Sequence, residues 1–375
     1  MKAKLRHFFT MLVLLVLALG SNDTFSAVLT WNASVSTDWN NPTNWTPPQV
    51  PTNTDHVIIN SGSVTIPANG TFAIMDWSAG TISGSLAVAS NGILNINGGN
   101  SYVVLGGVLT NAGTVNWLSG NLNLDNGNFG YPNSGPIVNL AGGSWDIQCD
   151  QYLDGWNSPD GYPYNTNAYF LNLGLVRKTA GSGTTVFGDY AVFFENAGTV
   201  EADSGTISLQ GGYSGSPSGD LAISLGGVTP GSGYGKISFS TPLPFDGTFT
   251  VSTRNGYHPS PGATFQVLSY PASTNAFICL SGLDLGGGIL LQPQFGPTSL
   301  TLLTTAYTAN ASLPQLFINR TLGGVAITWP VGFPGWTLQS TTNLSSHTWE
   351  TVPNACGNQA VVPGSAAQQY FRLTQ

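Results

Sequence analysis

The chain has 375 residues, and only 7% of them are charged, against about 25% in an ordinary globular domain. So few ionic side chains exclude coiled coils and helical bundles, whose outer faces need Glu, Lys and Arg. A hydrophobic content of 41% argues against disorder, and the 48 glycines and 23 prolines indicate a turn-rich β fold.

Residues 1–27 are predicted to be a cleaved secretory signal peptide. Three cations stand within the first six residues, and an apolar run follows from Phe8 to Leu19. The run is shorter than the ~20 residues that a spanning helix needs, which favours a leader over a membrane anchor. After Gly20, six of the nine Lys and Arg residues remain against 17 acids. We therefore expect a protein that is secreted to the medium, the cell surface or the periplasm. It is not expected to be membrane-integral or to bind nucleic acid.

Residues 28–60 are predicted to be a Trp-rich N-terminal cap. Trp31, Trp39 and Trp45 stand close together among Asn, Thr, Ser and Pro residues. Two interpretations are open, an exposed face that stacks on sugars or a hydrophobic plug. The plug is favoured, because a repetitive β array needs an end cap that hides its first layer.

Two internal repeats predict the architecture of the middle of the chain. Residues 108–127 and 193–212 are identical at nine of twenty ungapped positions, including Asn-Ala-Gly-Thr-Val in both. Their offset of 85 residues is close to four coils of about 21 residues each. Stacked coils place apolar side chains in inner columns and asparagines in hydrogen-bonded ladders. We therefore predict an all-β chain in which residues 61–304 form a right-handed parallel β-helix, or solenoid.

An aperiodic segment at residues 150–167 is predicted to be a loop inserted into a coil, and loops of this length are often functional. Its aromatic rings could stack on sugars or bind a partner, and the candidates in and just before it are Trp145, Tyr152, Trp156, Tyr162 and Tyr164. Carboxylate oxygens favour a weakly bound calcium ion, and the candidate ligands are Asp150, Asp154 and Asp160. The alternative is a solvated acidic loop whose aromatics pack onto the solenoid.

The end of the chain is predicted to be a separate unit. A Thr- and Ala-rich linker at residues 305–312 leads into residues 313–375, where about six short strands predict a small β-sandwich. The three cysteines, Cys149, Cys279 and Cys356, are expected to be independent buried thiols, although one bridge is possible.

Several stretches resemble the passenger regions of bacterial autotransporter- and adhesin-type β-helix proteins. The resemblance rests on Trp39 and Trp45 with the downstream Pro51, and on the segments 55–59, 174–178, 181–185, 194–200 and 255–268. The C-terminal unit is similar to a fibronectin-III-like module of secreted bacterial proteins, at residues 327–330, 335–344 and 370–373. The resemblance implies an extracellular β-helix and is only weakly specific for function.

The sequence carries no signature of a serine hydrolase, a zinc protease or a nucleotide-binding loop. The histidines after the leader, His56, His258 and His347, are isolated, so no metal site is expected among them. A β-helix lyase would need a cationic base, and Arg177 and Lys178 are the only close pair of cations. We therefore expect a non-enzymatic extracellular protein, without a resident cofactor, that contacts a cell surface, a matrix or a polysaccharide. The alternatives are a polysaccharide lyase or glycoside hydrolase of β-helix type, or a structural spacer of a surface layer.

Overall fold

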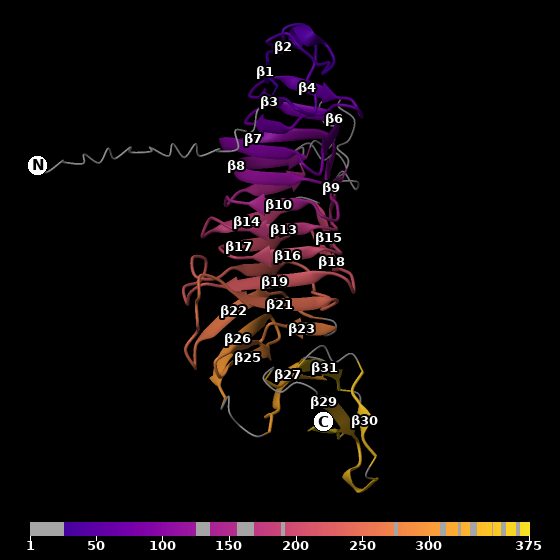
Figure 1. The fold of residues 1–375 in the computed structure, drawn as a ribbon, viewed down its shortest axis with the longest axis vertical. Helices are drawn as coiled ribbons and strands as arrows, with labels where there is room; N and C mark the ends of the chain where they lie inside the picture. The colour runs from indigo at the N-terminus through magenta and orange to yellow at the C-terminus, as the bar shows by residue number, and fades with distance from the viewer. Residues whose placement is uncertain are drawn as a thin grey trace, which may run out of the picture.

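The computed structural model describes most of the chain after residue 25. The described residues are 26–124, 136–155, 169–188, 192–273, 277–307, 313–321, 324–330, 336–346, 348–353, 358–364 and 368–375. Within them the fold is all-β, as predicted, with single 3₁₀ turns at Pro42–Asn44 and Leu344–Ser346. Strands β1 to β26 form one long and mostly parallel sheet that runs along the molecule's long axis (Figure 1).

Three ladders of parallel strands make up this sheet. The first ladder joins β1 (Val28–Trp31), β3 (His56–Ile59), β5 (Ile74–Trp77), the start of β7 (Ile93–Asn111), the start of β8 (Thr114–Leu124), β10 (Ser144–Ile147), β13 (Leu175–Lys178), β16 (Thr199–Ala202), β19 (Asp220–Leu225), β21 (Thr248–Thr253) and β23 (Cys279–Ser281). The second ladder joins β4 (Ser63–Ile66), the start of β6 (Thr81–Val88), the middle of β7, the end of β8, β11 (Tyr152–Gly155), β14 (Thr184–Phe187), β17 (Thr206–Leu209), β20 (Lys236–Phe239) and β22 (Thr264–Ser269). The third ladder joins the ends of β6 and β7, β9 (Ile137–Asn139), β12 (Tyr169–Asn172), β15 (Phe193–Asn196) and β18 (Tyr213–Gly215).

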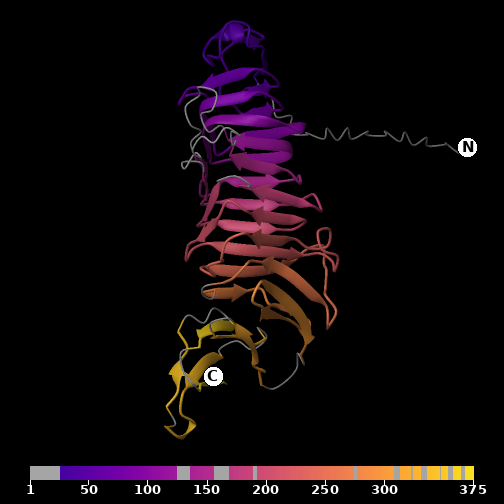
Figure 2. The same cartoon turned by 180° about the vertical axis from the view of Figure 1, so that it is seen from behind.

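The chain passes from the first ladder to the second and the third and then returns to the first, which is consistent with a β-helix-like fold. Figure 2 shows the stacked strands from behind. Alternating apolar residues explain why these segments stack. Val115, Trp145, Val176 and Val200 stand opposite one another in the first ladder, and all four are fully buried. Burying one such side chain contributes roughly 1.5–3 kcal/mol.

The two sequence repeats lie three strands apart in the first ladder, so the prediction of four coils of about 21 residues is wrong. The register runs from Thr114 to Ser144, then Leu175, then Thr199, in steps of 30, 31 and 24 residues. The extra residues stand in the sequence between second-ladder and third-ladder strands, where part of the chain lies outside the described residues. The inward apolar pattern preserves the register although the connections differ in length.

Four buried asparagines form the predicted hydrogen-bonded ladder at the end of the third-ladder strands. Asn111 Nδ2 donates to Asn139 Oδ1 at 2.8 Å, and Asn139 Nδ2 donates to Asn172 Oδ1 at 2.8 Å. Asn172 Nδ2 continues to Asn196 Oδ1 at 2.9 Å, and Asn196 Nδ2 ends on the carbonyl of Asp220 at 3.3 Å. A connected buried network of this kind fixes the register of successive strands, because an amide left unpaired inside the protein is costly.

The tryptophans near the N-terminus form an interior cluster at the first strands. Trp31, Trp39 and Trp45 are each 1% exposed, and Trp45 packs edge-on against both others with ring centroids 4.9 Å apart. Their interpretation as an exposed sugar-stacking face is therefore wrong. The parallel ladder already begins at β1, whose other neighbour is the antiparallel strand β2 (Trp45–Thr46).

The parallel ladders give way to antiparallel strands near the C-terminal end. Strand β22 pairs with β26 (Ser299–Ala306), which pairs with β25 (Ile289–Phe295), followed by β24 (Asp284–Gly286). The predicted linker therefore begins later than expected, because residues 305–306 still belong to β26.

The C-terminal unit consists of two small antiparallel sheets. One contains β27 (Phe317–Thr321), β28 (Gly324–Thr328) and β31 (Gln359–Pro363), and the other contains β29 (Thr337–Thr341), β30 (Glu350–Thr351) and β32 (Tyr370–Thr374). The unit has its own core of Ile327, Trp329, Leu338, Val352, Ala360 and Val362. The described part of the unit contains six short strands, the number expected, and its arrangement as a β-sandwich stays a prediction.

The cysteines do not all behave as predicted. Cys149 is a free buried thiol, as expected, but Cys279 is disulfide-bonded, so the prediction of three independent thiols is wrong. Cys356, the third cysteine, lies outside the described residues.

Candidate functional site

Aromatic and amide side chains line up on the outside of the second ladder. We call this surface the tyrosine–asparagine face; its residues are Tyr102, Asn121, Asn123, Tyr152 and Asp154. Tyr102 stands opposite Asn121 in the register of β7 and β8, and Asp154 stands opposite Asn123 in that of β8 and β11. The backbone amide of Tyr152 donates to Asn121 Oδ1 at 3.2 Å. The register thus brings together residues from three consecutive strands.

Strand alternation explains why these side chains point outward. Leu122, Leu124 and Leu153 occupy the intervening positions and are completely buried. Their neighbours must therefore lie on the opposite face of the sheet. Tyr102 is 46% exposed and Tyr152 is 43% exposed.

The spacing on this face suits an extended ligand. Adjacent strands are about 4.8 Å apart, so Tyr102 and Tyr152, on strands that flank β8, are separated by about 10 Å along the ladder. The Asn121 amide lies between the two tyrosine positions, and Asn123 and Asp154 follow on the same surface. Aromatic rings offer flat apolar surface, while amide and carboxylate groups bind hydroxyls.

Trp145 does not belong to this face, so its prediction as a glycan contact is wrong. It is 0% exposed and packs edge-on against Phe170, with ring centroids 5.1 Å apart. The reason is the alternation of β10, which places Trp145 and Ile147 inward and Asp146 outward. Four other candidate residues, Trp156, Asp160, Tyr162 and Tyr164, lie outside the described residues.

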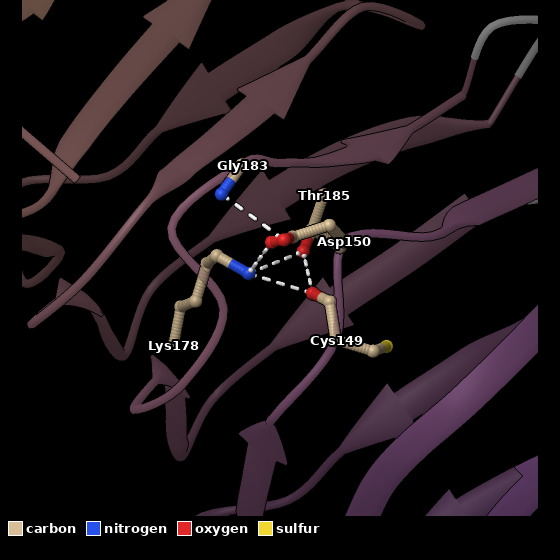
Figure 3. A network of polar contacts seen from close by, with 5 residues as sticks. All are labelled: Cys149, Asp150, Lys178, Gly183 and Thr185. Carbon is tan, nitrogen blue, oxygen red and sulfur yellow. Dashed lines mark hydrogen bonds and ion pairs between the residues drawn. The ribbon is translucent and has the colours of Figure 1, made fainter. Parts of the chain in front are cut away.

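Asp150 is held in a network around a buried cation (Figure 3). The Lys178 side chain is 0% exposed, and its Nζ donates to Asp150 Oδ1 at 2.7 Å, to the Cys149 carbonyl at 2.6 Å and to Thr185 Oγ1 at 3.0 Å. Asp150 Oδ2 accepts from the Gly183 amide at 3.0 Å. The three ammonium protons and both carboxylate oxygens therefore have partners.

This network does not fit the predicted calcium site. A calcium ion needs several free oxygen ligands, whereas Asp150 is bound to an ammonium group and a backbone amide. Asp154 instead lies on the tyrosine–asparagine face. Among the described residues, no group of three or more His, Cys, Asp or Glu side chains could hold a metal ion.

Arg177 and Lys178 point to opposite faces of β13, so the two cations do not act together. Lys178 stands in the inward column between Ile147 and Ala202, whereas Arg177 stands outward between Asp146 and Glu201. The sequence already indicates this difference. Residues two positions apart in a strand face the same side, so Lys178 faces inward like Val176.

A pair of acids lies beside Arg177 on the outer surface of the first ladder. Burial raises the pKa of Glu201, and the neighbouring Asp203 carboxyl raises it further. Burial also raises the pKa of Asp203, against the lowering effect of Arg177 and Arg254. The two carboxyls share a hydrogen bond. Catalytic carboxyls of glycoside hydrolases stand about 5 Å or more apart, so this contact does not match their geometry.

His56 begins a polar ladder on the outside of the first ladder. Its Nε2 lies 2.8 Å from Asp76 Oδ2, Asn95 Nδ2 donates to Asp76 Oδ1 at 2.8 Å, and Asn116 Nδ2 donates to Asn95 Oδ1 at 2.8 Å. Hydrogen-bonded amides thus recur on the surface as well as in the interior.

The comparison with protein families gives one finding. A model described as a domain of unknown function (DUF8693) matches residues 30–158. The matched segment contains the tryptophan cluster and all five residues of the tyrosine–asparagine face. No curated protein matches the chain. Within the part of the chain that the structure describes, no helix has both the length and the apolar character needed to cross a membrane.

Proposed function

We propose that the chain is a secreted extracellular right-handed β-solenoid that contacts a polysaccharide through the tyrosine–asparagine face. The observation that carries this proposal is the exposure of Tyr102 and Tyr152 on one surface, with Asn121 between them. Two rings at this spacing offer stacking surfaces for two separate sugar units. Asn121, Asn123 and Asp154 provide groups for the hydroxyls of the same glycan chain.

Rigidity supports this role. The five residues of the face lie on strands whose inward neighbours are fully buried, so their backbone is ordered before a ligand arrives. A preorganised surface avoids the entropic cost of ordering loops on binding. The low content of charged residues also suits a glycan that is recognised through hydroxyls rather than through ions.

The wider description rests on the order of the ladders and on the sequence. Connections between parallel strands of one sheet are right-handed in almost all proteins, which supports a right-handed solenoid. The leader pattern supports secretion, and the two small C-terminal sheets support a fibronectin-III-like module. An adhesin would use such a stack to present its binding face away from the cell surface.

A glycan array with the mature protein tests the proposal, with Tyr102→Ala, Tyr152→Ala and the double variant beside it. We expect each single substitution to weaken polysaccharide binding about tenfold, equivalent to ~1.4 kcal/mol. Phe193→Ala is the matched control, because Phe193 is 38% exposed but lies on the third ladder. The polysaccharide proposal fails if the mature protein binds no glycan. It also fails if both single tyrosine variants and the double variant bind glycans as tightly as the unmodified protein. The structural spacer then becomes the better interpretation.

A further inference from the structure

The C-terminal unit is docked on the end of the long sheet. Its strand β31 contacts β23 of the first ladder, and its strand β27 contacts β25 of the antiparallel hairpin. Figure 1 shows β27 and β31 beside this end of the sheet. The two parts of the chain therefore share an interface, although their described strands belong to separate sheets.

Strands β28 and β31 have one face toward the unit's own core and the other toward the long sheet. Ile327 and Ala360 are paired in the register and belong to the core of the unit. Ala326 and Val361 are the next pair, and both pack with the core of the long sheet. The alternation of the strands explains this division, because successive side chains point to opposite faces.

Thr328 and Gln359 weaken this interface. They are paired in the register and stand two positions from Ala326 and Val361, so they lie on the face turned toward the long sheet. Both residues are buried, but Thr328 Oγ1 and Gln359 Oε1 have no hydrogen-bond partner within the described part of the chain. Burial of a polar atom without a partner costs free energy. A covalent restraint at this interface would therefore be effective.

Cys279 provides such a restraint. It lies on β23, the strand that contacts β31, and it is disulfide-bonded. The chain has three cysteines and Cys149 is free, which leaves Cys356 as the partner within the chain. Cys356 stands three positions before Gln359, the first residue of β31, in the sequence. Because a disulfide requires two neighbouring segments of backbone, the contact between β23 and β31 is compatible with this bond.

We propose that a disulfide between Cys279 and Cys356 locks the C-terminal unit on the end of the stack, and that a dithiol reductant releases the unit while the stack stays folded. The reductant gives two electrons and two protons to the disulfide, which becomes two thiols, and the dithiol itself becomes a disulfide. The proposal does not depend on glycan binding at the tyrosine–asparagine face.

The sizes of the two cores explain why the unit should respond and the stack should not. The described core of the unit consists of six buried side chains, and small domains of this kind commonly depend on covalent links. A disulfide restricts the open states of the chain that it closes. The stack instead has a continuous apolar core along its ladders and the buried asparagine ladder.

Peptide mapping without reduction tests the pairing. The full protein is digested with pepsin at low pH, where thiols do not exchange, and the fragments are identified by mass spectrometry. We expect one cross-linked species that joins the peptides of Cys279 and Cys356, with Cys149 in an unlinked peptide. The proposal is overturned if Cys279 is linked to Cys149 or to a second copy of the chain.

Hydrogen exchange of the full protein tests the lock. In Cys279→Ser, the amides of β28 and β31 should exchange more than about tenfold faster, whereas those of β13 and β16 in the stack should be unchanged. The unmodified protein treated with a dithiol should behave in the same way. Cys149→Ala is the matched control, because it removes the free thiol and should leave β28 and β31 protected. Unchanged exchange of β28 and β31 in both Cys279→Ser and the dithiol-treated protein, or equal opening of β13 and β16, would overturn the proposal.

Discussion

Lys178 Nζ lies 2.7 Å from Asp150 Oδ1 and joins two successive layers of the stack. Asp150 stands in the turn between β10 and β11, and Lys178 ends β13 in the next layer. Within the part of the chain described, this is the ion pair that has a completely buried cation. The pair replaces an apolar contact in a column otherwise occupied by side chains such as Ile147 and Ala202.

Replacement of Lys178 by methionine should destabilise the protein. The variant leaves the Asp150 carboxylate and the Cys149 carbonyl without their cationic donor. Removing one partner of a buried pair costs about 3–5 kcal/mol, and we expect about 2–3 kcal/mol here because the Asp150 side chain is 37% exposed. Denaturant unfolding measures the change. Arg177→Met, on the outer face of the same strand, is the control, and an equal loss in both variants would contradict the structural role of Lys178.

The buried asparagine ladder should contribute more stability than the exposed one. Asn139→Ala removes an amide that bonds to both Asn111 and Asn172 and leaves buried polar atoms unpaired. We expect a loss of about 2–4 kcal/mol in the free energy of unfolding. Asn116→Ala, which acts on the solvent-facing ladder, should cost about 1 kcal/mol or less. A similar loss in the two variants would show that burial does not set the strength of these ladders.

The Cys149 thiol should be unreactive while the protein is folded. Burial raises the pKa of this thiol to about 11, although Lys178 acts to lower it. At pH 8 only about a thousandth of the thiol is therefore ionised, and the thiolate is the reactive form. Iodoacetamide should modify Cys149 only once the protein is unfolded, and no reductant should be needed. Mass spectrometry measures the modification. Cys279 should require reduction as well, because it is disulfide-bonded. Rapid labelling of Cys149 in the folded protein would show that this thiol is accessible.

The acids on the first ladder should reduce stability near neutral pH. Burial raises the pKa of Glu201 and of Asp220 above the values that the unfolded chain retains. Folding therefore favours the protonated form of both carboxyls. Their protonated forms stabilise the folded protein fully at a pH below the pKa of the unfolded chain. This stabilisation is lost as the pH rises through the higher pKa of the folded protein. Glu201→Gln should accordingly raise the melting temperature at pH 7 and have little effect at pH 3. Glu195→Gln, an exposed position on β15, provides the comparison. An equal shift at both pH values would exclude titration as the cause.

The all-β fold could be predicted because alternation, glycine turns and the repeated Asn-Ala-Gly-Thr-Val segment are local signals. The asparagine ladder followed from the same repeat, since Asn111 and Asn196 are equivalent positions in it. The inward position of Trp145 was also present in the pattern, because Trp145 and Ile147 alternate with Asp146. Its nearness to a segment rich in aromatics suggested a binding role instead.

The candidate site could be predicted only in part. The sequence names Tyr152 as a stacking candidate and Asp154 only as a calcium ligand. Tyr102 stands fifty residues before Tyr152, and only the pairing of β7, β8 and β11 places them on one surface. The number of residues between successive paired strands varies, so the sequence does not show which residues stand opposite one another. The disulfide of Cys279 likewise depends on a contact that spacing alone does not reveal.

The antiparallel strands at the two ends of the stack have a consequence for self-association. A parallel stack that stopped abruptly would present unpaired amides and carbonyls, and a second copy could add to them end to end as in a fibril. Here β2 covers part of the edge of β1, and β26 pairs along β22 in the opposite direction. The chain therefore covers part of each end of its own stack, which leaves a second copy less free edge to extend into a polymer.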